Sequence, residues 1–196
     1  MKIIFTMASI NNDYEKRKEE CVESYNVLKS YGLNPIVVEC FQHDKNMCYI
    51  KPDFITNTHT NSNNKGYLEC IAIKKLLSEI VVDENEDIVK ITGRYIMESN
   101  NFFNIVNESE SDTCYKTVDD NTQMFFGLFS SKYNILNSFL NKCDLDHMNR
   151  NMINVEKYYF DYIKQKQIKI EEVDKLNIRC RIFGRNENKK KDELVL

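Results

Sequence analysis

The sequence predicts an α/β fold in which a mixed, mainly parallel β-sheet is flanked by helices. Along the 196-residue chain, short apolar runs that suit buried strands alternate with longer segments of helical periodicity. The chain also opens with a strand–helix–strand pattern at residues 2–9, 14–31 and 36–40. Such a unit joins two parallel strands through a right-handed crossover. Strands and helices mix less regularly later, which predicts antiparallel additions to the parallel core.

The first helix has recognisable ends. The segment Asn11-Asn12-Asp13 can cap it, and Glu15 is placed for a capping box from Asn12. Gly32 is expected to end it, because glycine readily adopts the left-handed conformation that follows many helices. The apolar stripe of this helix consists of Cys21, Val22, Tyr25 and Leu28.

The remaining elements follow from the same patterns. Residues 41–63 are polar and irregular, which predicts a long surface loop. Further helices are expected at residues 64–80, 101–106, 133–141 and 153–164. Further strands are expected at residues 88–97, 114–118, 123–129, 168–173 and 178–183.

Composition bounds the class of protein. Hydrophobic residues make up 42% and charged residues 29%, with five glycines and two prolines, which excludes collagen-like, low-complexity and wholly disordered chains. We expect one domain over residues 1–185 and a charged, frayed tail over residues 186–196. The net charge of −3 provides no global positive field, so nucleic acid is not an expected partner.

Cysteine usage and hydropathy indicate a cytoplasmic protein. The seven cysteines are scattered without a CxxC pair, and the chain start is too short an apolar run for a signal peptide, which predicts reduced thiols. No apolar run approaches about 18 residues, so we expect no integral membrane segment. The three histidines have no close His/Cys spacing, and a zinc site is therefore not expected.

Two short motifs stand out. The first, Asn64-Lys65-Gly66-Tyr67-Leu68-Glu69, starts a predicted helix, and the second, Lys90-Ile91-Thr92-Gly93-Arg94-Tyr95, ends a predicted strand. Together they resemble the N-K-G-x-x-E and K-[IL]-T-G-R-Y motifs of small GT-A-type glycosyltransferases from polysaccharide loci or large viruses. The resemblance covers nearly the whole chain, through Phe126-Gly127-Leu128-Phe129, the helix at 153–162 with Glu156, and Asp174-Lys175-Leu176 with Arg181-Ile182-Phe183-Gly184.

The resemblance implies a GT-A-like nucleotide-diphospho-sugar transferase fold. It also implies transfer of a hexosyl or deoxyhexosyl group from a nucleotide-sugar donor to a glycan or other acceptor. In the wider GT-A pattern an apolar strand ends in Asp-x-Asp, which binds a metal on the donor diphosphate. Here Thr92-Gly93-Arg94 stands in that place, and the acids at 83–87 precede the strand. We therefore expect no metal ligands and no required cofactor, the alternative being Mn²⁺ or Mg²⁺ recruited by acids elsewhere.

Fixed cations must then stabilise the charge on the departing nucleotide. Arg94 offers a planar fork for phosphate oxygens, and Lys65 lies at a helix N-terminus that favours anions. We expect the donor to contact residues of both motifs, namely Lys65, Gly66, Lys90, Thr92, Gly93 and Arg94. The structural alternative is an ordinary strand closing in a turn, with Arg94 paired to a carboxylate.

Other strand ends and helix starts supply the remaining candidates, because ligands of such sheets bind beyond the carboxyl ends of parallel strands. The resemblance implies that Glu39 reads the nucleobase or ribose, with Thr6 and Ala8 beside it. For the catalytic base we consider Glu156 and Asp120, since an inverting transfer needs a carboxylate to take the acceptor proton. The alternatives are a solvated strand-end acid for Glu39, a helix first-turn acid for Glu156 and a hairpin acid for Asp120.

Two other functions stay open. A binding module of the same fold without catalysis is compatible with the missing Asp-x-Asp motif. A nucleotidyltransferase uses a related core, but it normally has a Gly-rich loop after the first strand, and residues 6–12 contain no glycine. The expected partners are the nucleotide sugar and a glycan or glycoconjugate acceptor, and a homodimer could complete the acceptor site of so short a chain.

Overall fold

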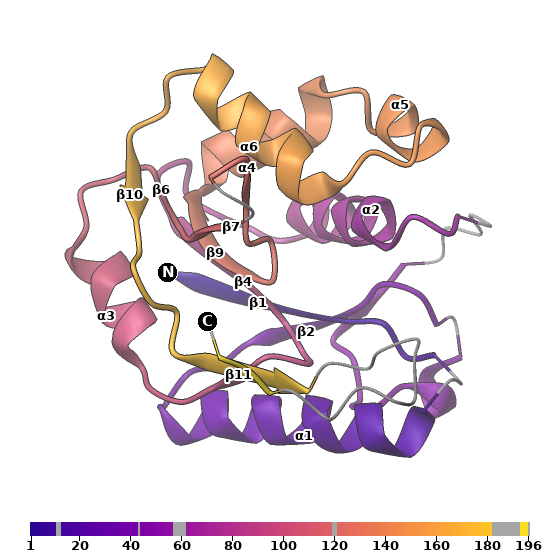
Figure 1. Ribbon diagram of the computed structural model, residues 1–196. Helices are drawn as coiled ribbons and strands as arrows, with labels where there is room; N and C mark the ends of the chain where they lie inside the picture. Colours follow the sequence, from indigo (N-terminus) through magenta and orange to yellow (C-terminus); the bar gives the residue numbers. More distant parts are fainter. Residues whose placement is uncertain (11–12, 43, 57–61, 119–120, 182–192, 196) are drawn as a thin grey trace.

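The computed structural model describes residues 1–10, 13–42, 44–56, 62–118, 121–181 and 193–195 (Figure 1). It confirms the N-terminal βαβ unit, formed by β1 (Lys2–Met7), α1 (Tyr14–Ser30) and β2 (Ile36–Glu39). Strands β1 and β2 pair in parallel, with Ile4 opposite Ile36. Gly32 follows α1 with φ of +76°, as predicted for its end. Asp13 is the N-cap residue of α1 and makes no side-chain capping hydrogen bond, and Asn12 of the expected capping box lies outside the described residues.

The central sheet has seven strands in the order β10-β6-β9-β4-β1-β2-β3. Its further members are β3 (Phe54–Ile55), β4 (Asp87–Thr92), β6 (Thr113–Tyr115), β9 (Leu128–Lys132) and β10 (Ile170–Glu172). Strand β9 runs antiparallel to its neighbours β4 and β6, and the other pairs are parallel. Every strand except β9 therefore points the same way, which confirms the predicted mainly parallel sheet.

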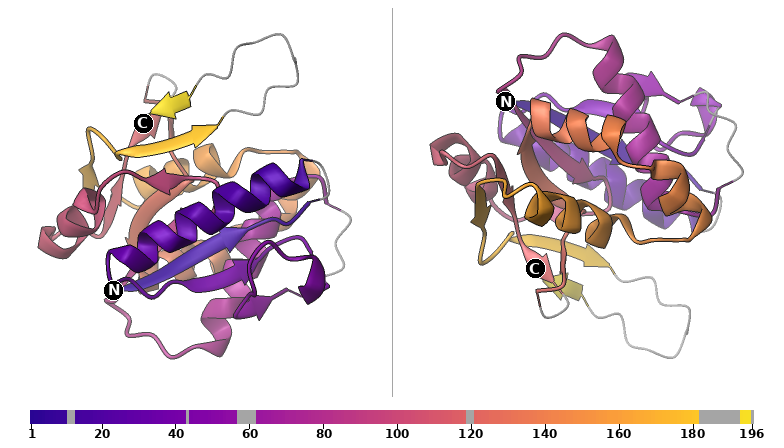
Figure 2. Two further views of the ribbon diagram at one scale, coloured as in Figure 1. Left: turned by 90° about the horizontal axis from the view of Figure 1, so that it is seen from below. Right: turned by 90° about the horizontal axis from the view of Figure 1, so that it is seen from above.

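Helices cover both faces of this sheet (Figures 1 and 2). Helix α1 lies on one face, and on the other lie α2 (Lys65–Glu79), α4 (Tyr133–Lys142), α5 (Leu145–Arg150) and α6 (Val155–Gln165). Side chains alternate between the faces along each strand. Ile3 and Phe5 pack in the core under α1, with α3 (Asn101–Glu108), whereas Ile4 packs in the core under α2. The two cores make a three-layer molecule.

Two smaller sheets extend the structure. One has the order β12-β11-β5, formed by β5 (Ile96–Met97), β11 (Ile178–Arg181) and β12 (Glu193–Val195). The other pairs β7 (Thr117–Val118) with β8 (Gln123–Met124). Of the expected C-terminal tail, residues 186–192 and 196 lie outside the described residues, and β12 pairs antiparallel with β11.

Some element boundaries were predicted wrongly. The single strand expected at residues 88–97 is two strands in different sheets, because the chain turns at Gly93 and Arg94 between β4 and β5. The strands expected at 114–118 and 123–129 are likewise divided, into β6 and β7 and into β8 and β9. The expected loop at 41–63 contains β3 and the 3₁₀ turn Lys45–Met47. Helix α5 was not predicted because it has only six residues.

The seven cysteines are all free thiols, and all but Cys143 are buried. Within the described parts of the chain, no helix is long and apolar enough to cross a membrane.

Candidate functional site

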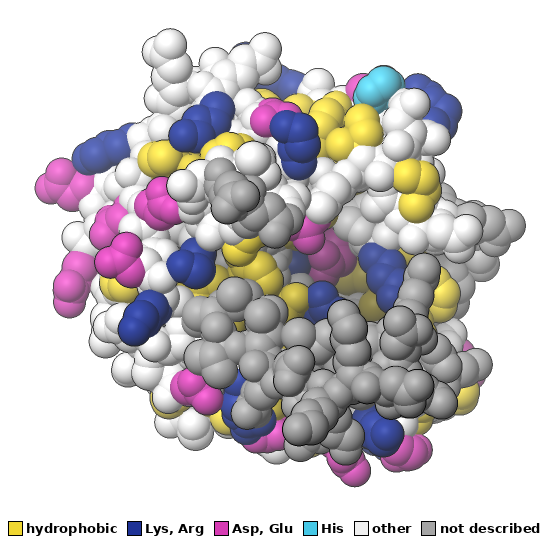
Figure 3. Space-filling view, viewed as in Figure 1, with side chains coloured by type: hydrophobic (Ala, Val, Ile, Leu, Met, Phe, Trp, Pro, Cys, Tyr) yellow, Lys and Arg dark blue, Asp and Glu magenta, His cyan; other side chains and the backbone are white. Residues whose placement is uncertain are grey.

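The predicted strand ends meet at one edge of the sheet. Thr6 of β1 lies opposite Thr92 of β4, and Met7 lies opposite Glu39 of β2. A cavity of about 440 Å³ opens at this edge, and Figure 3 shows a hollow right of centre where basic and acidic side chains gather. Eight predicted site residues line it, namely Ala8, Lys65, Gly66, Lys90, Thr92, Gly93, Arg94 and Glu156. Thr6 and Glu39 do not line the cavity, and Asp120 lies outside the described residues.

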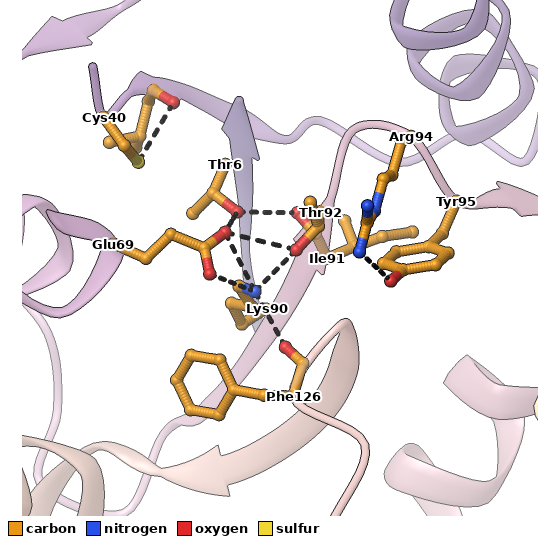
Figure 4. Close-up of polar contacts among 10 residues, drawn as sticks. Thr6, Cys40, Glu69, Lys90, Ile91, Thr92, Arg94, Tyr95 and Phe126 are labelled. Atoms are coloured by element: carbon orange, nitrogen blue, oxygen red, sulfur yellow. Dashed lines mark hydrogen bonds and ion pairs between the residues drawn. The ribbon is translucent and has the colours of Figure 1, made fainter. Parts of the chain in front are cut away.

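Arg94 occupies the turn after β4. Its Nη2 donates a hydrogen bond of 2.7 Å to the Tyr95 hydroxyl, and its Cζ lies 4.9 Å from the centre of the Tyr95 ring (Figure 4). Among the described residues, no carboxylate lies within ion-pair distance of Arg94. The expected structural alternative, an Arg94–carboxylate pair, is therefore not observed. The remaining N–H groups of the guanidinium can donate to an anion in the cavity.

Lys65 is the first residue of α2. The side chain of the N-cap residue Asn64 accepts a hydrogen bond of 3.1 Å from the Tyr67 N–H, which fixes the start of the helix at the cavity. Burial lowers the pKa of Lys65, and the positive charges of Arg17 and Arg94 lower it further. The helix N-terminus and these like charges together make this wall of the cavity favourable for an anion.

Glu156 lies in the first turn of α6. Its N–H donates a hydrogen bond of 3.1 Å to the side chain of Asn154, the N-cap residue, and its half-buried side chain lines the cavity. Burial raises the pKa of Glu156, while the charges of Lys90 and Arg94 oppose the increase. A carboxyl group with a raised pKa is a better proton acceptor once it is ionised, as a general base must be.

A buried polar network joins the two sequence motifs at the cavity floor (Figure 4). The Lys90 ammonium lies 3.2 Å from the Glu69 carboxylate, and it donates to the Thr92 hydroxyl at 2.6 Å and to the Phe126 carbonyl at 2.7 Å. The Thr6 hydroxyl donates to Glu69 at 2.8 Å. Each hydrogen of this ammonium therefore has an acceptor within the protein. The structure thus gives Lys90 and Thr6 internal partners, so both support the site from within.

Glu39 is completely buried, so it is not the solvated strand-end acid that was the alternative to nucleotide binding. Its carboxylate accepts hydrogen bonds from the Ser9 hydroxyl at 2.6 Å and N–H at 3.1 Å, from the Phe41 N–H at 2.8 Å, and from the Gln42 N–H at 2.9 Å. Burial raises the pKa of Glu39, and these bonds oppose the increase. Glu39 thereby fixes the segments that bring Ala8 and Phe41 to the cavity wall.

Two glycines permit the close packing behind the site. A Cβ on Gly66 would lie 2.5 Å from Val155 Cγ1, so glycine lets α2 approach the start of α6. A Cβ on Gly93 would lie 2.8 Å from both Phe5 Cζ and Cys21 Sγ. At Gly93 the backbone thus approaches β1 and α1 closely.

Several contributors were not predicted. They are Glu69, Arg17, Phe41 and Tyr49, all of which line the cavity. A lysine within an apolar strand needs a buried acid, so Lys90 was a usable signal for Glu69. No local sequence pattern marks Arg17, Phe41 or Tyr49 as site residues, because only the tertiary fold brings them to the cavity.

The side chains at the end of β4 do not fit a divalent cation. Thr92, Gly93 and Arg94 supply no carboxylate, and the guanidinium would repel the ion. Glu98, the next acid along the chain, lies 3.9 Å from Arg179. No group of three His, Cys, Asp or Glu side chains among the residues placed in the structure could hold a metal.

The strand order, the crossovers and the cavity at the carboxyl edge define the nucleotide-diphospho-sugar transferase fold. One similar structure is the inositol-1-phosphate CTP transferase from T. maritima (TM-score 0.57, 10% identity, covering 88% of this chain and 84% of that chain). Another is a protein from Bacillus anthracis described as a glucose-1-phosphate thymidylyltransferase (TM-score 0.56, 9% identity, covering 89% of this chain and 87% of that chain). A third is a glycosyltransferase involved in glycosylation of the major capsid of PBCV-1 (TM-score 0.55, 7% identity, covering 88% of this chain and 82% of that chain). No protein-family model and no curated protein matches the sequence.

Proposed function

We propose that the protein is a glycosyltransferase that moves a hexosyl or deoxyhexosyl group from a nucleotide sugar to a hydroxyl group of a glycan acceptor. One observation carries the proposal. A single cavity at the carboxyl edge of the sheet brings basic side chains and the N-terminus of α2 together with Glu156 at the start of α6. That arrangement suits a reaction in which cations stabilise a leaving phosphate and a carboxylate in the same cavity takes up a proton.

In this proposal, Arg94 and Lys65 bind the donor phosphates, and the N-terminal N–H groups of α2 face the same anion. The acceptor oxygen attacks the anomeric carbon, and the bond from that carbon to the phosphate oxygen breaks. The bonding electron pair leaves with the nucleotide, whose growing charge is stabilised by the fixed cations. Glu156 takes the acceptor proton as that oxygen loses electron density.

We further propose that this transfer needs no divalent metal. The charge that a metal would supply comes from side chains, because the strand end that usually carries Asp-x-Asp carries Arg94. The residues Thr92, Gly93 and Arg94 support this proposal, since they supply a guanidinium and no carboxylate. The carboxylate beside them, Glu69, accepts a hydrogen bond of 3.2 Å from the Thr92 hydroxyl and is already paired with Lys90.

A nucleotidyltransferase is the second candidate, because two of the three structures compared above transfer nucleotides. That reaction would join a sugar phosphate to a nucleoside triphosphate and release pyrophosphate. It is disfavoured by residues 6–12, which contain no glycine for a phosphate-binding loop after β1.

The test is a product assay with two arms. In the first, the protein is incubated with UDP-, GDP-, dTDP- and CMP-sugars, with and without an oligosaccharide acceptor mixture, and nucleotide release is measured. In the second, nucleoside triphosphates and sugar 1-phosphates are supplied, and pyrophosphate is measured. We expect release in the first arm alone, lost in Glu156→Gln and kept in the exposed control Glu79→Gln. Pyrophosphate release, or nucleotide-sugar binding without turnover, would contradict the proposal.

A further inference from the structure

A third basic side chain reaches the cavity from the opposite face of the sheet. Arg17 lies in the first turn of α1, and it lines the cavity together with Lys65 and Arg94. Helices α1 and α2 lie on opposite faces of the sheet (Figures 1 and 2). The three cations therefore come from three elements that are far apart in sequence, and they meet only at the carboxyl edge of the strands.

The electrostatics of the cavity agree with this geometry. The charges of Arg17 and Arg94 both lower the pKa of Lys65, so the three groups are close enough to repel one another. Of the acids that line the cavity, Glu69 is already paired with Lys90 at 3.2 Å, which leaves Glu156 in the first turn of α6. An anion placed among the three cations would relieve their repulsion.

We propose that Arg17 is a phosphate-binding residue, and that Arg17, Lys65 and Arg94 together hold the diphosphate of the donor. This inference rests on the proposed function and adds the residue that closes the phosphate site from the side of α1. A diphosphate presents oxygen atoms in several directions, and two planar guanidinium groups with one ammonium can approach it from three sides. Arg17 thus adds a third positive charge to those of Lys65 and Arg94.

The experiment compares two substitutions on the same helix. Arg17→Gln and Lys16→Gln each remove one positive charge, but Lys16 is exposed and does not line the cavity. Binding of UDP, GDP, CDP and dTDP is measured by isothermal titration calorimetry, and the melting temperature without ligand checks the fold. We expect Arg17→Gln to weaken the best-bound diphosphate by about tenfold or more, and Lys16→Gln to change it less than about twofold.

A third variant keeps the test decisive if Arg17→Gln does not fold. Arg17→Lys keeps the charge and loses the planar fork, so it should bind between the wild type and Arg17→Gln, and about threefold or more below the wild type. Equal affinities for the wild type and the Arg17 variants would overturn the role of Arg17, and so would equal losses of affinity in Arg17→Gln and Lys16→Gln. Either result would leave the proposed function standing. If the wild type binds none of the four diphosphates, the proposed function fails together with this inference.

Discussion

Arg94 is the side chain on which the proposed phosphate site depends most directly. It has no ion-pair partner among the described residues, and its orientation is fixed by the Tyr95 hydroxyl. Replacement of Arg94 by Ala should weaken nucleotide binding or kcat/KM by about 2–4 kcal/mol, because a charge-assisted contact to the donor phosphates is lost. Arg94→Lys should recover only part of this, since the ammonium lacks the planar fork.

Calorimetry with UDP and GDP measures the effect of Arg94→Ala. The matched control is Arg150→Ala, because Arg150 is 67% exposed and lies 3.8 Å from Asp144 on the surface. An Arg94→Ala protein that binds nucleotides as well as the Arg150→Ala protein would refute the phosphate assignment.

Glu156 should show opposite effects on turnover and stability. Burial raises its pKa, so the folded protein holds this proton to higher pH than the unfolded chain does. The stabilisation is fully present below the ordinary carboxyl pKa and is lost as the pH rises through the raised value. Glu156→Gln should therefore melt at a higher temperature than the wild type at neutral pH, and at the same temperature in acid.

The same substitution removes the proposed proton acceptor. Turnover of Glu156→Gln should fall by on the order of 100-fold or more, with nucleotide affinity retained. In the wild type, kcat should rise with pH through the raised pKa of Glu156 and then reach a plateau. A Glu156→Gln protein that keeps its turnover, or that melts below the wild type at neutral pH, would disprove this role.

At the level of elements, the Glu69–Lys90 pair joins α2 to β4. Lys90 is 1% exposed and Glu69 17%, so removal of one partner leaves a charge in a desolvated place. Lys90→Met should lower the free energy of unfolding by about 3–5 kcal/mol in urea titrations, and a Lys90→Met/Glu69→Leu protein should recover part of the loss.

The surface provides the comparison for this pair. Lys157 and Asp161 lie 3.0 Å apart on α6 with more than half of each side chain exposed, so Lys157→Met should cost less than about 1 kcal/mol. If Lys90→Met costs no more than Lys157→Met, the network does not hold the two elements together.

Elements with regular periodicity were predictable from the sequence, and turns between apolar residues were not. Residues 2–9 and 36–40 are apolar runs on either side of a helix, and this pattern predicts the parallel βαβ unit that β1, α1 and β2 form. The division between β4 and β5 was missed because apolar residues continue on both sides of Gly93. Nothing in the local pattern shows that Gly93 must pack against Phe5 and Cys21.

For the site, the edge of the sheet was predictable and the partners of each side chain were not. Lys65, Arg94 and Glu156 do line one cavity, as their positions at strand ends and helix starts indicated. The burial of Glu39 depends on donors from Ser9 and from the turn after β2, and such contacts leave no sequence pattern.

For the whole molecule, the placement of its charges leads to a prediction about metal dependence. Arg17, Lys65 and Arg94 line the cavity, and the end of β4 supplies no carboxylate, so transfer or donor hydrolysis should persist in excess EDTA. Added Mn²⁺ or Mg²⁺ should give little gain in rate, measured as nucleotide release. Strict dependence on either ion would refute this and would direct attention to Asp119, Asp120 and Glu98 as ligands.

The buried thiols give the cavity a built-in chemical reporter. Cys21 and Cys40 both line it, and burial is the main cause that raises the pKa of each. Alkylating reagents attack the thiolate, so these two positions should react only when the side chains packed over them move. The rate of their modification, followed by peptide mass spectrometry, is therefore a measure of how often the cavity lining opens.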